Sequence, residues 1–129
     1  MAVDILIAED EPSILEALTF VLRRAGWTVQ TVTDGEAVMN AVRREAPRML
    51  VLDIMLPKRS GFEVLKQIRS GEATATLPVL VLTAKGQQQD RRIAEEFGAD
   101  SFVTKPYSNA DVVDAVRALL GEPATADSR

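Results

Sequence analysis

An unbroken apolar run that ends on a carboxylate does most to limit how this chain can fold. The run covers residues 49–52 and is followed at once by Asp53, with Pro47 and Pro57 on either side. A second unbroken apolar run covers residues 78–82 and is followed by Thr83. Strands without polar alternation are typical of a parallel sheet with helices on both faces. We therefore expect Asp53 at the carboxyl end of a buried strand, where such sheets bind ligands, although a single aspartate there is also explained as the cap of a turn.

The rest of the chain predicts shorter strands and amphipathic helices in alternation. Besides the two runs, strands are expected at residues 3–8, 27–32 and 101–104, and helices at residues 12–25, 34–46, 60–70, 87–97 and 108–120. Five strands that alternate with five helices require a three-layer α/β domain with right-handed crossovers. We expect one domain over residues 1–121 and a flexible polar tail over residues 122–129.

Composition excludes several classes of function. The 129 residues carry a formal net charge of −4, which argues against direct binding of nucleic acid because that normally requires a basic surface. The chain has no cysteine and no histidine, so disulfides, thiolate metal sites, Ser-His triads and His-ligated zinc are excluded. No segment approaches the roughly 18 consecutive apolar residues of a membrane span, and no signal peptide is visible. We expect a soluble cytoplasmic protein that does not contact the membrane.

Polar residues follow four of the predicted strands at the same edge of the sheet. Glu9 and Asp10 come after the first strand, and Asp53 follows the third. Thr83 ends the fourth strand, and Lys105 follows the fifth. Each is an ordinary cap or surface group when taken alone, but three carboxylates crowded together repel one another unless a cation is present. Oxygen ligands without His or Cys favour Mg²⁺.

These motifs resemble the receiver domain of response regulators in bacterial two-component signalling. The matching residues are Glu9-Asp10, the stretch 52–57, Gly61, the stretches 82–84 and 98–100, and Lys105-Pro106. They occur in the family's order and spacing over nearly the whole chain. The resemblance implies a flavodoxin-like, doubly wound (βα)₅ fold whose five-stranded parallel sheet has the strand order 2-1-3-4-5.

The resemblance also implies a role for each acidic residue of this edge. Asp53 would accept a phosphoryl group from the phosphohistidine of a sensor histidine kinase or of a histidine phosphotransfer protein. Asp10, Asp53 and the backbone carbonyl of Met55 would bind Mg²⁺. Glu9 would act through a water molecule. The domain would be a regulatory phosphoacceptor rather than an enzyme, although it would promote its own phosphorylation and dephosphorylation.

Three further residues would take part in phosphoryl transfer or in the response to it. Lys105 and the Thr83 hydroxyl would stabilise the charge that develops during phosphoryl transfer. By resemblance, Thr83 then moves toward the phosphoryl group and Phe102 follows it, which changes the output surface. Phe102 is equally well explained as an ordinary core residue. The bond between Lys105 and Pro106 resembles one that is cis in the family.

Three residues bear on partners. Ser101 and Ala115 stand where receivers that precede winged-helix DNA-binding domains carry an acidic residue and an arginine that pair across a dimer. We therefore expect a monomer or a weak dimer that depends on phosphorylation, with an output protein that the sequence does not identify. Phe20 lies off the apolar stripe of its helix, and we expect it to pack on a neighbouring helix rather than to face a partner.

Three other functions share parts of this pattern. A Mg-dependent aspartyl-phosphate phosphatase of the haloacid dehalogenase type would place its nucleophile after the first strand in an Asp-x-Asp motif, which residues 9–11 do not match. A flavin or nucleotide carrier would require a glycine-rich phosphate loop, and the sequence has none. A pseudo-receiver that signals by binding alone would not require the intact set of Asp10, Asp53, Thr83 and Lys105.

Overall fold

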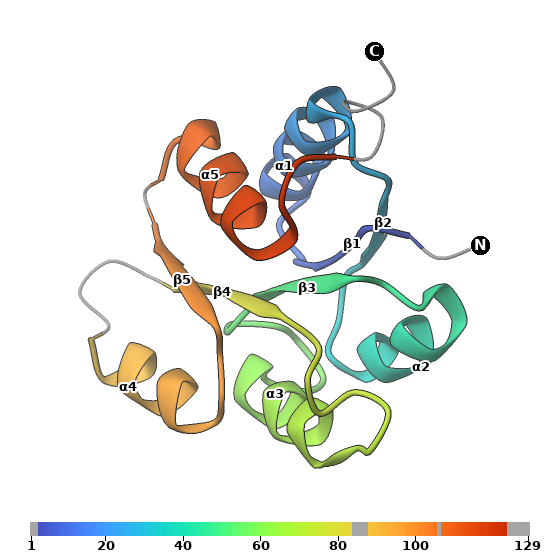
Figure 1. Ribbon diagram of the computed structural model, residues 1–129. Coiled ribbons are helices and arrows are strands. Elements are labelled where there is room, and N and C mark those ends of the chain that lie inside the picture. Colours follow the sequence, from blue (N-terminus) through green and yellow to red (C-terminus); the bar gives the residue numbers. More distant parts are fainter. Residues whose placement is uncertain (1–2, 84–87, 106, 124–129) are drawn as a thin grey trace.

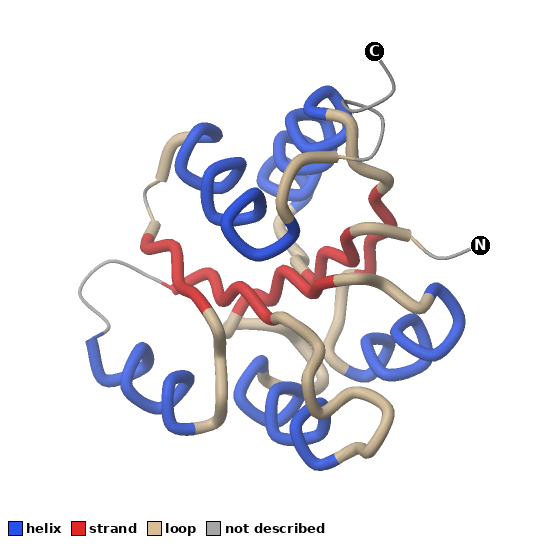
Figure 2. The backbone as a smooth tube through the Cα atoms, viewed as in Figure 1, coloured by secondary structure: helices blue, strands red, loops and turns tan. Residues whose placement is uncertain are grey.

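The computed structural model describes residues 3–83, 88–105 and 107–123, and it contains one parallel sheet with the strand order β2-β1-β3-β4-β5. The strands are β1 (Ile5–Ala8), β2 (Val29–Val32), β3 (Met49–Asp53), β4 (Val79–Thr83) and β5 (Ser101–Thr104). The helices are α1 (Pro12–Ala25), α2 (Glu36–Glu45), α3 (Gly61–Ser70), α4 (Gln88–Glu96) and α5 (Asn109–Leu120). Helices α1 and α5 cover one face of the sheet, and α2, α3 and α4 cover the other (Figures 1 and 2). The predicted flavodoxin-like fold is confirmed.

The sheet divides the apolar core into two clusters. Alternate side chains of a strand point to opposite faces, so Ile7 and Val51 pack beneath α1 and α5, whereas Ala8 and Leu52 pack against α2, α3 and α4. Every residue of β3 and β4 is buried, as the two apolar runs indicated. Each large aliphatic side chain buried in this way contributes roughly 1.5–3 kcal/mol. The two central strands therefore form a rigid platform whose carboxyl ends are well fixed.

Short polar sequences determine where the helices begin. The Ser60 side chain accepts a hydrogen bond from the first turn of α3, and Ser108 forms a reciprocal capping box with Asp111 at the start of α5. These caps satisfy backbone N–H groups that have no partner within the helix. At α2, Asp34 accepts from the backbone of the first turn, but the capping position itself is taken by Gly35. Helix α2 therefore begins at Glu36, two residues after the predicted start at residue 34.

The edge strand β2 begins later than predicted. It starts at Val29 because Trp27 turns inward and is only 2% exposed, within the cluster beneath α1 and α5. The Thr28 carbonyl accepts a hydrogen bond from Ile5 of β1, and the Val32 carbonyl accepts one from Glu9, the residue after β1. The intervening Val29 carbonyl points away from the sheet, where it accepts a hydrogen bond from the Arg23 guanidinium at 2.9 Å. Its position at the edge of the sheet agrees with the strand order that the family resemblance implies.

Phe20 does not pack on a neighbouring helix, so that expectation is wrong. Its side chain is 64% exposed. The buried residues of α1 are Leu18 and Leu22, each of which lies two positions from Phe20 and hence roughly 200° around the helix. The Arg24 guanidinium, on the same helix, lies 6.0 Å from the centre of the Phe20 ring. The buried stripe of α1 thus leaves Phe20 on the solvent side.

Some expectations fall on residues outside the described ranges. These are the bond before Pro106, the start of the fourth predicted helix at residue 87, and most of the tail over residues 122–129. Across residues 3–83, 88–105 and 107–123, no helix combines the length and apolarity needed to cross a membrane.

Candidate functional site

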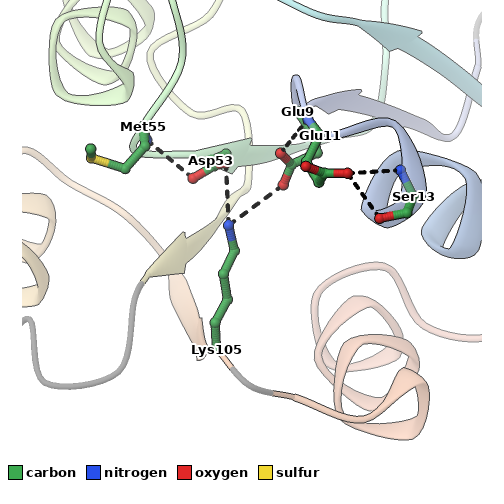
Figure 3. Close-up of polar contacts among 6 residues, drawn as sticks. All are labelled: Glu9, Glu11, Ser13, Asp53, Met55 and Lys105. Carbon is green, nitrogen blue, oxygen red and sulfur yellow. Dashed lines mark hydrogen bonds and ion pairs between the residues drawn. The ribbon is translucent and has the colours of Figure 1, made fainter.

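The ends of β1 and β3 and the residue after β5 bring two carboxylates and an ammonium group together (Figure 3). Glu9 lies two residues after Ile7, and Asp53 lies two residues after Val51, so strand alternation directs both carboxylates to the face beneath α1 and α5. The Lys105 ammonium is 3.3 Å from Asp53 Oδ2 and 3.7 Å from Glu9 Oε1. The structure thus joins three of the residues that the sequence assigned to this edge.

Asp10 completes a group of three carboxylates. One oxygen atom each from Glu9, Asp10 and Asp53 lies within 4.8 Å of the others. Glu9 and Asp53 are 0% and 3% exposed, whereas Asp10 is exposed. An ion bound here would therefore have protein on one side and solvent on the other. That environment suits Mg²⁺, which is usually held by one or two carboxylates and retains several of its waters.

The Glu9 carboxylate is buried at an energetic cost. Its Oε2 atom accepts a hydrogen bond from the Glu11 backbone N–H at 3.0 Å, but its Oε1 atom has no hydrogen-bond partner among the described residues. Burial raises the pKa of Glu9 to about 7, and the negative charge of Asp53 adds to the rise. A cation bound among these carboxylates would relieve both effects. The donor set therefore fits a divalent cation.

Asp53 is held by the loop that follows it. The Met55 backbone N–H donates to Asp53 Oδ1 at 3.1 Å, opposite the oxygen that faces Lys105 (Figure 3). The Met55 side chain is 71% exposed. Helix α3 closes this loop because the Gly61 N–H donates to the Ile54 carbonyl at 2.9 Å. A Cβ atom at residue 61 would lie 2.6 Å from the Asp53 carbonyl oxygen, so this close approach requires glycine.

Thr83 and Phe102 lie on the opposite face of the sheet, above α4. The buried Thr83 hydroxyl is 3.4 Å from the Thr104 hydroxyl, while the Lys105 backbone N–H donates to the Thr83 carbonyl at 2.7 Å. Phe102 is half-buried, with the Arg91 guanidinium 5.0 Å from its ring centre. Thr83 is therefore at the predicted strand end, but its hydroxyl faces Thr104 rather than the carboxylates.

Sequence reasoning did not single out Tyr107. Its ring packs against the cluster beneath α1 and α5, and its hydroxyl is buried without a hydrogen-bond partner among the described residues. Burial raises the pKa of Tyr107 to about 12, and the charges of Glu9 and Asp53 contribute. A tyrosine two residues after Lys105 was the signal in the sequence that could have drawn attention to this position.

Comparison with known proteins decides the family. The family model of the response regulator receiver domain matches residues 5–117. This chain belongs to that family. Receiver domains are regulatory modules of two-component systems, and response regulators partner with histidine kinases. Because the receiver-domain model matches most of the chain, the sequence no longer supports an aspartyl-phosphate phosphatase or a flavin or nucleotide carrier.

Curated relatives of this receiver are longer proteins. It is 44% identical over 118 residues to the probable transcriptional regulatory protein TcrX of Mycobacterium tuberculosis, an alignment that covers 92% of this chain and 50% of TcrX. It is 42% identical to the alkaline phosphatase synthesis transcriptional regulatory protein PhoP of Bacillus subtilis, with 90% and 48% covered. The chain thus spans about half the length of these relatives.

Solved structures of receivers are similar to this one. A putative response regulator from Chloroflexus aurantiacus has a TM-score of 0.88 at 31% identity, covering 95% of this chain and 100% of that one. The receiver domain of the sensor histidine kinase PA1611 from Pseudomonas aeruginosa, described with magnesium in its active-site cleft, has a TM-score of 0.84 at 26% identity, with 95% and 100% covered.

The expectation of no direct contact with nucleic acid does not fit the relatives. One of them, 41% identical over 90% of this chain and 48% of its own length, is the DNA-binding dual master transcriptional regulator RpaA of Synechocystis. The expectation came from the net charge of −4 of this chain, which says nothing about the parts of the relatives beyond the match. The expectation of no contact with nucleic acid therefore does not hold for whole response regulators that contain a receiver of this kind.

Proposed function

We propose that this receiver accepts a phosphoryl group on Asp53 from a histidine kinase or a histidine phosphotransfer protein, and that the modified domain then binds its output partner. The main support is the setting of Asp53: it is 3% exposed, held between the Met55 N–H and the Lys105 ammonium, and next to two more carboxylates. Membership of the receiver family supports the kinase as the donor.

Asp10, Asp53 and the backbone carbonyl of Met55 would hold Mg²⁺, and Glu9 would hold one of its waters. When bound, the ion would neutralise negative charge on the carboxylates and on the oxygens of the incoming phosphoryl group. The grouping of the Glu9, Asp10 and Asp53 oxygens within 4.8 Å supports this assignment.

The chain's own residues would then carry out the transfer. An Asp53 carboxylate oxygen attacks phosphorus, the bond from phosphorus to the donor imidazole nitrogen breaks, and the imidazole leaves with that electron pair. Lys105 is placed to neutralise charge on the phosphoryl oxygens. The Thr83 hydroxyl would exchange its 3.4 Å contact with Thr104 for a hydrogen bond to the phosphoryl group, and Phe102 would move on the same face of the sheet.

Phosphorylation by a small donor tests this proposal. Incubation with acetyl phosphate and Mg²⁺ is expected to add one phosphoryl group per chain, measured by intact mass spectrometry. Asp53→Asn should abolish the adduct because an amide is not a usable nucleophile, whereas Asp34→Asn, which changes an aspartate next to α2, should leave it unchanged. An adduct that persists in Asp53→Asn, or no adduct on the unmodified chain, would contradict the proposal.

The metal assignment predicts that Mg²⁺ stabilises the fold. At ten times its dissociation constant, a ligand that binds only the folded state contributes about 1.4 kcal/mol, which corresponds to roughly 3–5 °C in the melting temperature. Asp10→Ala should remove this shift. Asp114→Ala changes an exposed carboxylate on α5 and should keep it. Thermal melts with and without millimolar Mg²⁺ measure the effect, and an intact shift in Asp10→Ala would place the ion elsewhere.

The lifetime of phospho-Asp53 should depend on Met55. Hydrolysis requires a water aligned opposite the carboxylate, and the exposed Met55 thioether cannot orient one by hydrogen bonding. We expect slow decay and several-fold faster decay in Met55→Asn. Lys85, outside the described residues, is expected to pair with phosphoryl oxygens, so Lys85→Ala should act in the same direction. Decay time courses in Mg²⁺ test both, and unchanged or longer lifetimes in both variants would refute the idea.

A further inference from the structure

Two buried oxygen atoms near the site have no hydrogen-bond partner among the described residues. They are Glu9 Oε1 and the Tyr107 hydroxyl. Nearly all buried polar atoms in folded proteins are paired, either with the protein or with an ordered water. Leaving either atom unpaired lowers the stability of the folded state. One small polar partner between them would satisfy both atoms.

Both residues lie on the same side of the sheet, beneath α1 and α5. Glu9 follows Ile7 by two residues, and Ile7 belongs to the apolar cluster against which Tyr107 packs beneath α1 and α5. The ammonium group of Lys105, two residues before Tyr107 in the chain, lies beside Glu9 Oε1. The negative charges of Glu9 and Asp53 contribute to the raised pKa of Tyr107, which agrees with this placement.

Lys105 supplies a third polar group. Its ammonium lies 3.7 Å from Glu9 Oε1, which is too long for a direct hydrogen bond. A buried water normally makes two to four hydrogen bonds to polar groups that lack other partners. A carboxylate oxygen, a phenol and an ammonium group meet that requirement. Holding such a water lowers its entropy, but its hydrogen bonds offset that loss.

We propose that Tyr107 positions the Glu9 carboxylate through one buried water, which accepts a hydrogen bond from the Tyr107 hydroxyl and donates one to Glu9 Oε1. Tyr107 is then a positioning residue that keeps Glu9 oriented toward Asp10 and Asp53. Its effect on metal binding rests on the proposed function. The hydrogen-bonded link itself does not, because it would be present without the ion.

A double-mutant cycle without metal tests the link. In EDTA at pH 8, Tyr107→Phe is expected to lower the melting temperature by roughly 3–8 °C, since it removes a donor in a chain of hydrogen bonds to a charged group. In a Glu9→Met background the acceptor is gone, so the same change should have no effect or should raise the melting temperature. A rise in the unmodified protein, or equal falls in both backgrounds, would overturn the proposal.

A matched control and a metal titration complete the test. Trp27→Phe removes the other unpartnered ring group of this face, the indole N–H, and its effect should be the same in both backgrounds. Tyr107→Phe should also weaken Mg²⁺ binding by roughly tenfold, as loss of a group behind a metal ligand commonly does. Unchanged affinity would refute the positioning role. If the unmodified protein binds no Mg²⁺, the proposed function is wrong. The double-mutant cycle of Glu9 and Tyr107 still tests the hydrogen-bonded link, because it is measured without metal.

Discussion

Replacing Glu9 with glutamine is expected to stabilise the metal-free domain by about 3 kcal/mol at pH 8 and to change its stability little at pH 5. Burial raises the pKa of Glu9 from an ordinary 4.5 to about 7 in the folded state. Between these values the folded chain keeps a proton that the unfolded chain has lost. The free energy of unfolding therefore falls as the pH rises from about 4.5 to about 7 and levels off above that. Glutamine is neutral throughout and should remove this slope.

Denaturant titrations in EDTA at several values between pH 5 and pH 8 measure this effect. Glu16→Gln is the matched control because Glu16 is an exposed glutamate on α1, and it should not alter the slope. Saturating Mg²⁺ at pH 8 should stabilise the unmodified protein more than Glu9→Gln, since the ion offsets the charge that the variant lacks. If the free energy of unfolding changed with pH in the same way in the unmodified protein and in Glu9→Gln, Glu9 would not be the source of the pH dependence.

Replacing Gly61 with alanine is expected to lower the free energy of unfolding by roughly 3 kcal/mol and to slow phosphorylation of the molecules that remain folded. The added Cβ would lie 2.6 Å from the Asp53 carbonyl oxygen and 2.7 Å from the Ile54 Cα atom. Neither backbone atom can move without shifting the end of β3. The reduced entropy of the unfolded chain offsets only about 0.4–1 kcal/mol of this loss.

Gly71→Ala provides the comparison at the other end of α3. Its backbone conformation suits alanine, with φ at −87°, and the new Cβ would approach the Thr74 hydroxyl, which is part of a side chain. A side chain can turn away more easily than backbone, so we expect a smaller loss of stability and unchanged phosphorylation. Denaturant titration and the acetyl phosphate reaction distinguish the two variants. Equal losses of stability and of phosphorylation rate in the two variants would show that the close contact between Gly61 and Asp53 is not specifically important.

Local patterns were sufficient for most of the fold. The unbroken apolar runs predicted β3 and β4 because both faces of those strands are covered, and this is visible in residue types alone. The strand order came from the family resemblance, since periodicity does not determine which strands are neighbours. The starts of β2 and α2 were each misplaced slightly, because the inward turn of Trp27 and the position of Gly35 depend on packing between distant segments.

The sequence predicted which residues form the site, but it did not predict how their side chains are packed. Strand ends placed Glu9, Asp53 and Lys105 on one edge, and a topological rule is enough for that. The full burial of Glu9 and the hydroxyl pair of Thr83 with Thr104 depend on side-chain packing across strands far apart in the sequence. Tyr107 was overlooked for the same reason, since its ring packs against the cluster beneath α1 and α5.

The hydrogen bond from Arg23 to the Val29 carbonyl has a consequence for solubility. An edge strand with free backbone groups invites a second chain to extend the sheet, which is a common start of aggregation. Here the outward Val29 carbonyl is already occupied by a guanidinium at 2.9 Å, and an incoming strand would have to displace that charged side chain. A residue of α1 therefore covers one outward backbone acceptor of the β2 edge, which hinders the addition of a further strand at that point.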